Sequence, residues 1–246
     1  MNKYIYTAAA SGNQTMDQMA TATNNVANLT TDGFRAQLDS FRAVPVVSKD
    51  LPVQAFVVDA TVGADFSPAT SHKTDRNLDV ALQGKGWLVV QDSKGREAYT
   101  RAGSLKTDPN GLLQTQHGLY VLSDAGPITL PPDESVTIGK DGTISTIPVG
   151  NNVANTNLIG RLKLVNPPEN NLVRGDDGLF RTKNGVAAET DPNVTVVSGA
   201  VEDSNVNAVK GLVDIIALSE KFAVNMKLLT SAQMNDEKAS TVISRN

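Results

Sequence analysis

The chain has 246 residues, of which 40% are hydrophobic, 20% are charged and only 4% are aromatic, and its formal net charge is −4. A chain of this length can bury a substantial core, as one large domain or two smaller ones. The mild acidity comes without a basic block or stripe, which argues against nucleic acid as a partner. The absence of cysteine excludes disulfides, thiolate metal sites and cysteine nucleophiles.

The first ten residues carry a short apolar run, which the polar residues 11–14 interrupt. This run is too short and too polar for a secretory signal, and no segment approaches the length of an apolar membrane span. If the protein works outside the cytoplasm, we expect an export route that leaves its N-terminus uncut.

Residues 4–28 contain no proline and predict a helix. Small or apolar residues recur there at alternating steps of three and four, the period of helices that wrap on other helices. These residues are Ile5, Ala8, Gly12, Thr15, Met19, Ala22, Val26 and Leu29. Residues 28–33 carry turn chemistry, which predicts the end of the helix.

Residues 51–201 have a different pattern, in which short runs of Val, Leu, Ile and Thr alternate with turns that contain Gly and Asp. No helix-period segment interrupts these runs, so a parallel sheet is improbable and an antiparallel, β-rich region is predicted. Strands are expected at 87–90, 104–107, 136–138 and 158–165. The polar, Asn-rich stretch 150–157 is a candidate boundary between two lobes.

The helical pattern returns at residues 205–243. One stripe of this segment carries Leu212, Ile215, Phe222, Met226 and Leu229, with Ser219 and Gln233 in the same register. Gly211 weakens the start of this helix by about 1 kcal/mol relative to Ala.

Taken singly, each stripe favours a helix that caps the β core of a monomer. Two such helices at opposite ends of one chain instead favour helices that pack on each other and on neighbouring subunits, and contacts of that kind build filaments. The expected fold is therefore mainly β, with an antiparallel β-rich centre flanked by N- and C-terminal α-helices that pair as a coiled-coil-like inner layer. The expected parts are an N-terminal helix (1–33), an extended connecting segment (34–70), a β-rich outer domain of one or two lobes (71–200) and a C-terminal helix (201–246).

The search for catalytic, cofactor-binding and metal-ligating residues predicts none. His72 and His117 are isolated, and neither has the spacing of a zinc ligand pair. The glycines of Gly84-Lys85-Gly86 precede a predicted strand and not a helix, so they lack a helix N-terminus that could hold a phosphate. The Asp-rich turns lack the alternating ligands of a calcium loop.

Two alternatives stay open at this point. The first is a glycan hydrolase that uses two carboxylates, for instance Asp75 with Asp79 or Glu97. The second is a β-rich carbohydrate-binding module, although such sites usually need exposed aromatic platforms and this chain has few aromatics.

Two segments resemble the signatures of flagellar rod and hook proteins. The first runs from Asn24 to Arg35 and matches the pattern Asn-Asn-x-Ala-Asn-x-x-Thr-x-Gly-aromatic-basic, and the second runs from Gly199 to Val206 ahead of the C-terminal helix. The residues that carry the match are Asn24, Asn25, Ala27, Asn28, Thr31, Gly33, Phe34, Arg35, Glu202, Ser204 and Asn205.

The resemblance covers nearly the whole chain and is greatest to the proximal rod members of the family. It extends to residues 77–84, 99–103 and 160–165. The chain departs from the family pattern at Lys210 and Gly211, where an acid and Met are usual, and at Ala223, where Glu is usual.

The resemblance implies a structural subunit of the basal-body rod, without cofactors or a small-molecule substrate, that transmits motor torque. It implies export without cleavage by the flagellar apparatus and a place in the periplasmic rod. The implied partners are other rod proteins, copies of the chain itself and the export apparatus. The two stripes supply the predicted assembly interface, which consists of Ile5, Ala8, Gly12, Met19, Ala22, Val26, Leu29, Leu212, Ile215, Phe222, Met226 and Leu229.

Overall fold

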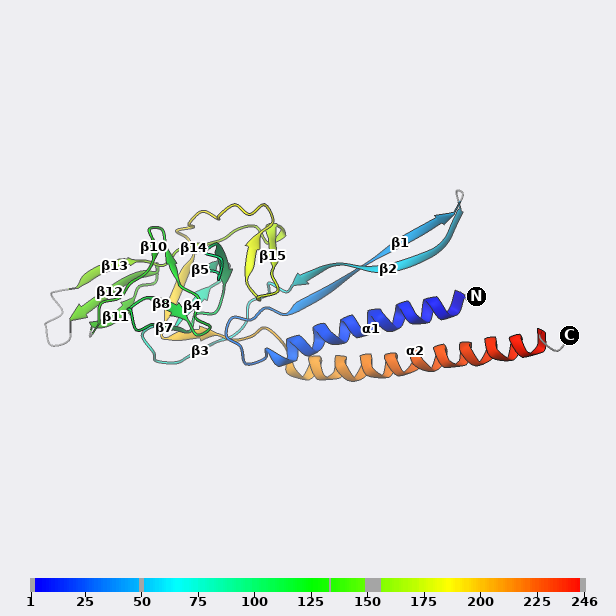
Figure 1. Cartoon of the computed structure of the whole chain (residues 1–246). Helices are drawn as coiled ribbons and strands as arrows, with labels where there is room; N and C mark the ends of the chain where they lie inside the picture. The colour runs from blue at the N-terminus through cyan, green and yellow to red at the C-terminus, as the bar shows by residue number, and fades with distance from the viewer. Residues whose placement is uncertain (1–2, 49–50, 133, 149–155, 244–246) are drawn as a thin grey trace. The chain divides into compact units, whose positions relative to one another are not determined.

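A computed structural model describes residues 3–48, 51–132, 134–148 and 156–243 (Figure 1). The chain divides into two compact units. The helical unit comprises Met1–Asn28, Gln37–Ala64 and Val206–Asn246, and the β unit comprises Leu29–Ala36 and Asp65–Asn205. Each unit is therefore assembled from segments that are distant in the sequence.

The helical unit consists of two helices and a two-stranded ribbon. α1 (Lys3–Ala27) and α2 (Ala208–Ile243) run antiparallel and side by side, and β1 (Gln37–Ser48) pairs with β2 (Leu51–Ala64) next to α1 (Figure 1). The predicted terminal helices and their pairing are thus confirmed. α2 begins three residues later than expected because Asn207 caps it, its Oδ1 accepting the Lys210 N–H at 2.9 Å.

The contact between the helices follows a heptad seam on α2. Half-buried residues recur there at steps of four and three, namely Gly211, Ile215, Leu218, Phe222, Asn225, Leu229 and Ala232. A Cβ on Gly211 would lie 2.7 Å from Cγ2 of Val26. The glycine that lowers helix propensity therefore allows the two helices to approach closely. Farther along, Asn225 Nδ2 donates to Thr15 Oγ1 at 3.4 Å.

The β1–β2 ribbon contains two register shifts, between Ser40 and Phe41 and between Val46 and Val47. An isolated two-stranded ribbon is marginally stable in water and needs support from another element. α1 supplies part of that support, because Thr21 Oγ1 donates to Asp39 Oδ1 at 2.6 Å.

The β unit is built from short antiparallel strands (Figure 1). One sheet has the strand order β14-β5-β6-β16-β15, a second has the order β11-β12-β13, and the remaining strands form the pairs β17-β4, β18-β3, β7-β8 and β10-β9. The strands are β3 (Ser71–Lys73), β4 (Val80–Gln83), β5 (Trp87–Gln91), β6 (Glu97–Thr100), β7 (Leu105–Thr107), β8 (Leu113–Thr115), β9 (Leu122–Ser123), β10 (Gly126–Pro127), β11 (Glu134–Ile138), β12 (Thr143–Pro148), β13 (Asn157–Arg161), β14 (Leu164–Val165), β15 (Leu172–Arg174), β16 (Phe180–Thr182), β17 (Thr195–Ser198) and β18 (Ala200–Glu202), with a 3₁₀ turn at Glu169–Asn171.

The core of the β unit lies between these sheets and consists of aliphatic side chains. Its buried members include Val80, Leu88, Val90, Leu113 and Ile144, all fully enclosed. This core matches the alternation of apolar and polar residues along the predicted strands. The prediction of a mainly β, antiparallel fold flanked by helices is confirmed.

A buried carboxylate fixes the turn between β5 and β6. Asp92 Oδ1 accepts the backbone N–H groups of Lys94 at 2.8 Å and Arg96 at 2.9 Å, and its Oδ2 accepts Arg181 Nη2 at 3.0 Å. Burial alone would raise the pKa of Asp92, but these hydrogen bonds outweigh it and hold the pKa well below the ordinary 3.8. Asp92 is therefore a charged structural residue that ties β16 to the turn.

Two details of the middle region differ from the expected strands. The run 158–165 forms two strands, β13 and β14, because Leu162 turns into the core and its N–H donates to the carbonyl of Gly142 at 2.9 Å. The candidate boundary at 150–157 lies largely outside the described residues. The strands on its two sides, β12 and β13, pair with each other in one sheet.

Candidate functional site

The predicted interface residues of α1 lie at half-buried or buried positions. Ala8, Met19, Ala22 and Val26 are half-buried and Gly12 is buried. A Cβ on Gly12 would meet no atom within 4 Å, so the position of close helix approach is Gly211 and not Gly12. The structure does not describe the side chain of Ile5.

Leu29, the last residue of the predicted helical stripe, lies outside α1. α1 ends at Ala27, and Leu29 is half-buried in the β unit, where it begins the segment Leu29–Ala36. The helix therefore ends at the turn that begins at residue 28, before the last position of the apolar repeat is reached.

On α2 the predicted stripe divides into two groups. Ile215, Phe222 and Leu229 lie in the seam against α1, whereas Leu212 and Met226 remain 53% and 44% exposed. The seam passes through the preceding residues, Gly211 and Asn225, because the first allows close approach and the second bonds to Thr15. Leu212 and Met226 therefore do not hold the helix pair of this chain together.

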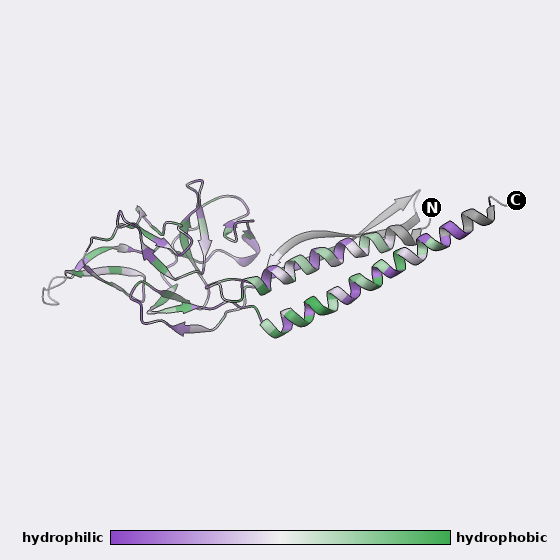
Figure 2. Cartoon of the chain, turned by 60° about the horizontal axis from the view of Figure 1, so that its bottom comes forward, coloured by the Kyte–Doolittle hydropathy of each residue, from purple (hydrophilic) through white to green (hydrophobic). Residues whose placement is uncertain are grey.

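α2 carries a second apolar surface, which α1 does not cover. We call it the outer face, and it consists of Val209, Leu212, Val213, Ile216 and Val224, all more than half exposed. Figure 2 shows hydrophobic residues concentrated in the first turns of α2. Apolar side chains on more than one side of a helix indicate that the helix packs on more than one neighbour.

An open pocket of about 420 Å³ lies between the two helices near the start of α1. Ala8 and Ser11 line it from α1, and Asn225, Leu228 and Ala232 line it from α2. Small side chains on both walls leave room for an inserted side chain, as at helix–helix contacts.

The residues of the first family signature hold the end of α1 and the start of β1. Asn25 makes a pair of hydrogen bonds to the backbone of Gln37, accepting its N–H at 2.8 Å and donating to its carbonyl at 3.0 Å. Asn28 donates to the carbonyl of Asn24 at 2.9 Å. Ala27 is exposed and Thr31 is half-buried.

Gly33 occupies a position that admits only glycine. Its φ is +66°, and a Cβ there would lie 2.1 Å from the carbonyl carbon of Arg101. Its N–H donates to the carbonyl of Glu202 at 2.7 Å. The first signature thereby contacts the second, on β18.

Arg35, Arg101 and Glu202 form a buried ionic cluster in the β unit. Arg35 Nη2 lies 2.6 Å from Glu202 Oε1, and Arg101 Nη1 lies 2.6 Å from Oε2 of the same carboxylate. Arg101 also donates to the carbonyls of Gly84 and Gly86. Burial lowers the pKa of the Arg101 guanidinium below its ordinary value, the Glu202 carboxylate opposes this effect and Arg35 adds to it. One carboxylate thus pairs with two buried guanidinium groups, one through each oxygen.

Aromatic rings lie next to Arg101 of this cluster. Phe66, Trp87 and Phe180 contact one another, with ring centroids 4.6 to 5.9 Å apart, and Arg101 lies 5.7 Å from the Trp87 ring. Phe34 of the first signature is buried below Arg174, whose Cζ is 4.5 Å from its ring. Trp87 and the two rings it contacts therefore lie on one side of the Arg101 guanidinium.

Asn205, at the end of the second signature, bonds to backbone groups of two other segments. Its Oδ1 accepts the Ala36 N–H at 2.7 Å, and its Nδ2 donates to the carbonyls of Asp65 at 2.9 Å and Ser67 at 3.2 Å. Ser204 is half-buried beside it. Arg101 is a member of this site that no sequence pattern indicated, although it lies in the stretch 99–103 that resembles the family.

The candidate catalytic carboxylates are not brought together in a catalytic arrangement. Asp79 is buried and accepts Thr74 Oγ1 at 2.7 Å, Asp75 pairs with Lys73 at 2.6 Å, and Glu97 pairs with Lys163 at 2.6 Å. Each carboxylate therefore has its own structural partner.

The two histidines are both exposed. His72 Nδ1 lies 2.6 Å from Asp203 Oδ1. No group of three or more potential metal ligands occurs in the ranges that the structure describes. Within the same ranges, no helix is long and apolar enough to span a membrane.

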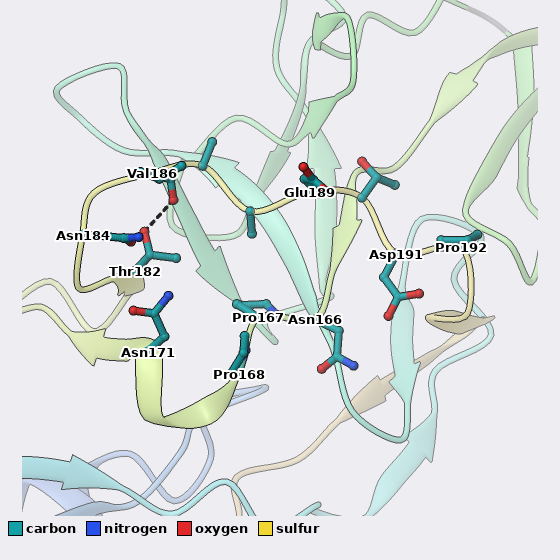
Figure 3. Close-up of a pocket in the computed structure, with 13 residues that line it drawn as sticks. Asn166, Pro167, Pro168, Asn171, Thr182, Asn184, Val186, Glu189, Asp191 and Pro192 are labelled. Atoms are coloured by element: carbon teal, nitrogen blue, oxygen red, sulfur yellow. Dashed lines mark hydrogen bonds between the residues drawn. The ribbon is translucent and has the colours of Figure 1, made fainter.

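The β unit has a shallow loop-lined pocket of about 420 Å³ (Figure 3). Asn166, Asn171 and Asn184 contribute amides, and Glu189 and Asp191 contribute carboxylates. Its 13 lining residues include no histidine, cysteine or aromatic ring. The pocket therefore has no histidine base, no cysteine nucleophile and no aromatic platform for a sugar.

Comparison with known proteins identifies the class. Residues 81–146 match the family model of the flagellar hook protein FlgE/F/G D1 domain, and residues 197–242 match that of the flagellar basal body rod FlgEFG protein C-terminal region. The flagellar basal-body rod protein FlgF of Escherichia coli K12 is 43% identical over 99% of each chain, and that of Salmonella typhimurium LT2 is 42% identical over 99% of each. The flagellar basal-body rod protein FlgG of Buchnera aphidicola subsp. Acyrthosiphon pisum is 29% identical over 88% of this chain and 90% of its own.

These similarities define a structural protein of the flagellar rod and hook class. The chain belongs to the family of flagellar basal-body rod proteins, with the FlgF proteins. It is a structural subunit of the basal body and not an enzyme, so the hydrolase alternative is withdrawn.

Proposed function

We propose that the chain joins the rod through its terminal helices and thereby transmits motor torque towards the hook and filament. The observation that carries this proposal is the outer face of α2, which stays exposed although α1 and α2 already pair. Its partners are neighbouring rod subunits, which include other rod proteins and copies of this chain. The interface residues expected from the sequence, apart from Leu29, lie on these same two helices.

The energetics favour a covered outer face. Burying one Val, Leu or Ile side chain is worth about 1.5–3 kcal/mol relative to leaving it exposed. Val209, Leu212, Val213 and Ile216 lie within about two turns of α2, so one neighbouring helix can cover several of them together. The pocket beside Ala8 and Ala232 offers a second place for a neighbour's side chain.

The proposed place of the chain is the part of the rod that crosses the periplasm, and the proposed route is the flagellar export apparatus. Membership of the basal-body rod family supports both. A subunit delivered through that apparatus meets its neighbours at the growing end of the rod. The helical unit would then be covered during assembly and not before.

We expect Ile216→Asp to abolish incorporation into the rod while leaving the isolated chain as stable as wild type. Ile216 is 60% exposed, so the charge is solvated in the free chain, but it would be buried and unpaired against a neighbour. Purified basal bodies from a complemented deletion strain, probed for the chain, give the measurement.

Val186→Asp is the matched control, because Val186 is 62% exposed on the β unit. It should incorporate normally. Normal incorporation of Ile216→Asp would contradict the assignment of the outer face. A large drop in its melting temperature would show that Ile216 serves the fold of the single chain.

A further inference from the structure

The chain passes between the helical unit and the β unit at four points, after residues 28, 36, 64 and 205. The residues that end the β unit at three of these points are Ala36, Asp65 and Asn205. We call them the exits. Because the backbone is continuous, a force that passes between the units along the chain passes through these exits and through the fourth crossing, after residue 28.

Asn205 links the three exits through one side chain. It accepts the Ala36 N–H at 2.7 Å and donates to the Asp65 carbonyl at 2.9 Å. The Asp65 N–H in turn donates to the Ala36 carbonyl at 2.8 Å. The exits therefore form a closed set of hydrogen bonds, in which Asn205 makes two of the three contacts.

The same segments are held a second time by the buried ionic cluster. Arg35, one residue before Ala36, is paired with Glu202, three residues before Asn205. Glu202 Oε1 also accepts the Ala69 N–H at 3.1 Å, four residues after Asp65. Each exit is thus tied to the Glu202 carboxylate within four residues.

We propose that Asn205, backed by the Arg35–Glu202–Arg101 cluster, is a positioning residue that holds the three exits at a fixed spacing and shares mechanical load among them. A force applied at one exit is then resisted by three chain segments together. Arg35 from the first family signature and Glu202 and Asn205 from the second therefore belong to one set of contacts. This role goes beyond assembly through the helices and rests on the rod function only for the origin of the load.

The first test measures hydrogen exchange in the free full-length chain with Asn205→Ala. The amide of Asp65 should exchange about tenfold faster, although Asn205 does not accept its proton, because the loss of roughly 1.4 kcal/mol of local stabilisation changes an opening equilibrium tenfold. Amides of the core, such as those of Val90 and Leu113, should stay unchanged. Unchanged exchange at Asp65 would overturn the proposal, since Asn205 would then hold only Ala36.

Asn193→Ala is the matched control, because Asn193 bonds only to Asp191 of its own turn among the contacts that the structure gives for its side chain. It should leave the Asp65 amide unchanged. If Asn205→Ala does not fold, Asn205→Asp keeps the acceptor for the Ala36 N–H and removes the donor to Asp65, and is measured in the same way.

The second test measures swimming speed in media of increasing viscosity, in a deletion strain that carries each variant. Asn205→Ala should enter basal bodies normally and match wild type at low viscosity, but lose at least half of its relative speed at high load. Asn193→Ala should follow wild type throughout. A load dependence equal to wild type, or absence of Asn205→Ala from basal bodies, would overturn the load-bearing role. A failure of the proposal that the chain joins the rod through its helices gives a different result, because Ile216→Asp would then be incorporated normally.

Discussion

Glu202→Leu should destabilise the β unit by about 3–5 kcal/mol, the usual cost of removing one partner of a buried ion pair. The carboxylate is buried and contacts both Arg35 and Arg101 at 2.6 Å, so its removal leaves two enclosed guanidinium groups without a counter-charge. It also removes the acceptor of the Ala69 N–H. Urea denaturation of the purified full-length chain, followed through Trp87, measures the loss.

Asp203→Asn is the matched control, because Asp203 is the next residue and its ion pair with His72 is exposed. Its cost should stay within about 1 kcal/mol. Replacing the whole cluster with Arg35→Met, Arg101→Met and Glu202→Leu should recover part of the loss, since no buried charge then lacks a partner. Equal stability of Glu202→Leu and wild type would contradict the assignment of the cluster.

Gly33→Ala should cost about 3 kcal/mol or more, because backbone strain and overpacking act at the same residue. The added Cβ would lie 2.1 Å from the carbonyl carbon and 2.3 Å from the carbonyl oxygen of Arg101, and these backbone atoms cannot rotate away. If the Arg101 carbonyl were pushed aside, both the position of Arg101 and the hydrogen bond from the Gly33 N–H to the Glu202 carbonyl would be disturbed. The melting temperature of the chain should fall accordingly.

Gly84→Ala separates the effect of backbone strain from the effect of overpacking. Gly84 has φ +68°, almost equal to the +66° of Gly33, but a Cβ there would meet no atom within 4 Å. It should therefore cost only the left-handed strain, about 1–2 kcal/mol. A loss at Gly33 no greater than at Gly84 would show that the Arg101 backbone moves freely and that the close approach is unimportant.

Elements with local signals could be predicted from the sequence. The 3.5-residue repeat of α1 and the stripe of α2 gave both helices to within three residues, because helix periodicity is a property of neighbouring positions. The turns that follow β5 and β7 were likewise expected from their Asp and Gly residues. The antiparallel arrangement followed from the absence of helices between the strands.

Contacts between distant segments could not be predicted in this way. Arg35 and Glu202 are 167 residues apart, and no local period indicates that they meet in one buried cluster. The predicted stripe on α2 is displaced from the seam by one residue at four positions, which are Leu212, Ser219, Met226 and Gln233. At two of the four, the true seam residues Gly211 and Asn225 are not apolar and were not counted. Their contribution depends on the partner helix, which supplies Val26 and Thr15.

A reconstruction of the intact basal body at side-chain resolution tests the central claim most directly. The account predicts that this chain lies in the rod, with Val209, Leu212 and Ile216 of α2 buried against helices of neighbouring subunits. A rod in which these three side chains face solvent, while other surfaces of the chain make the contacts with its neighbours, would contradict it.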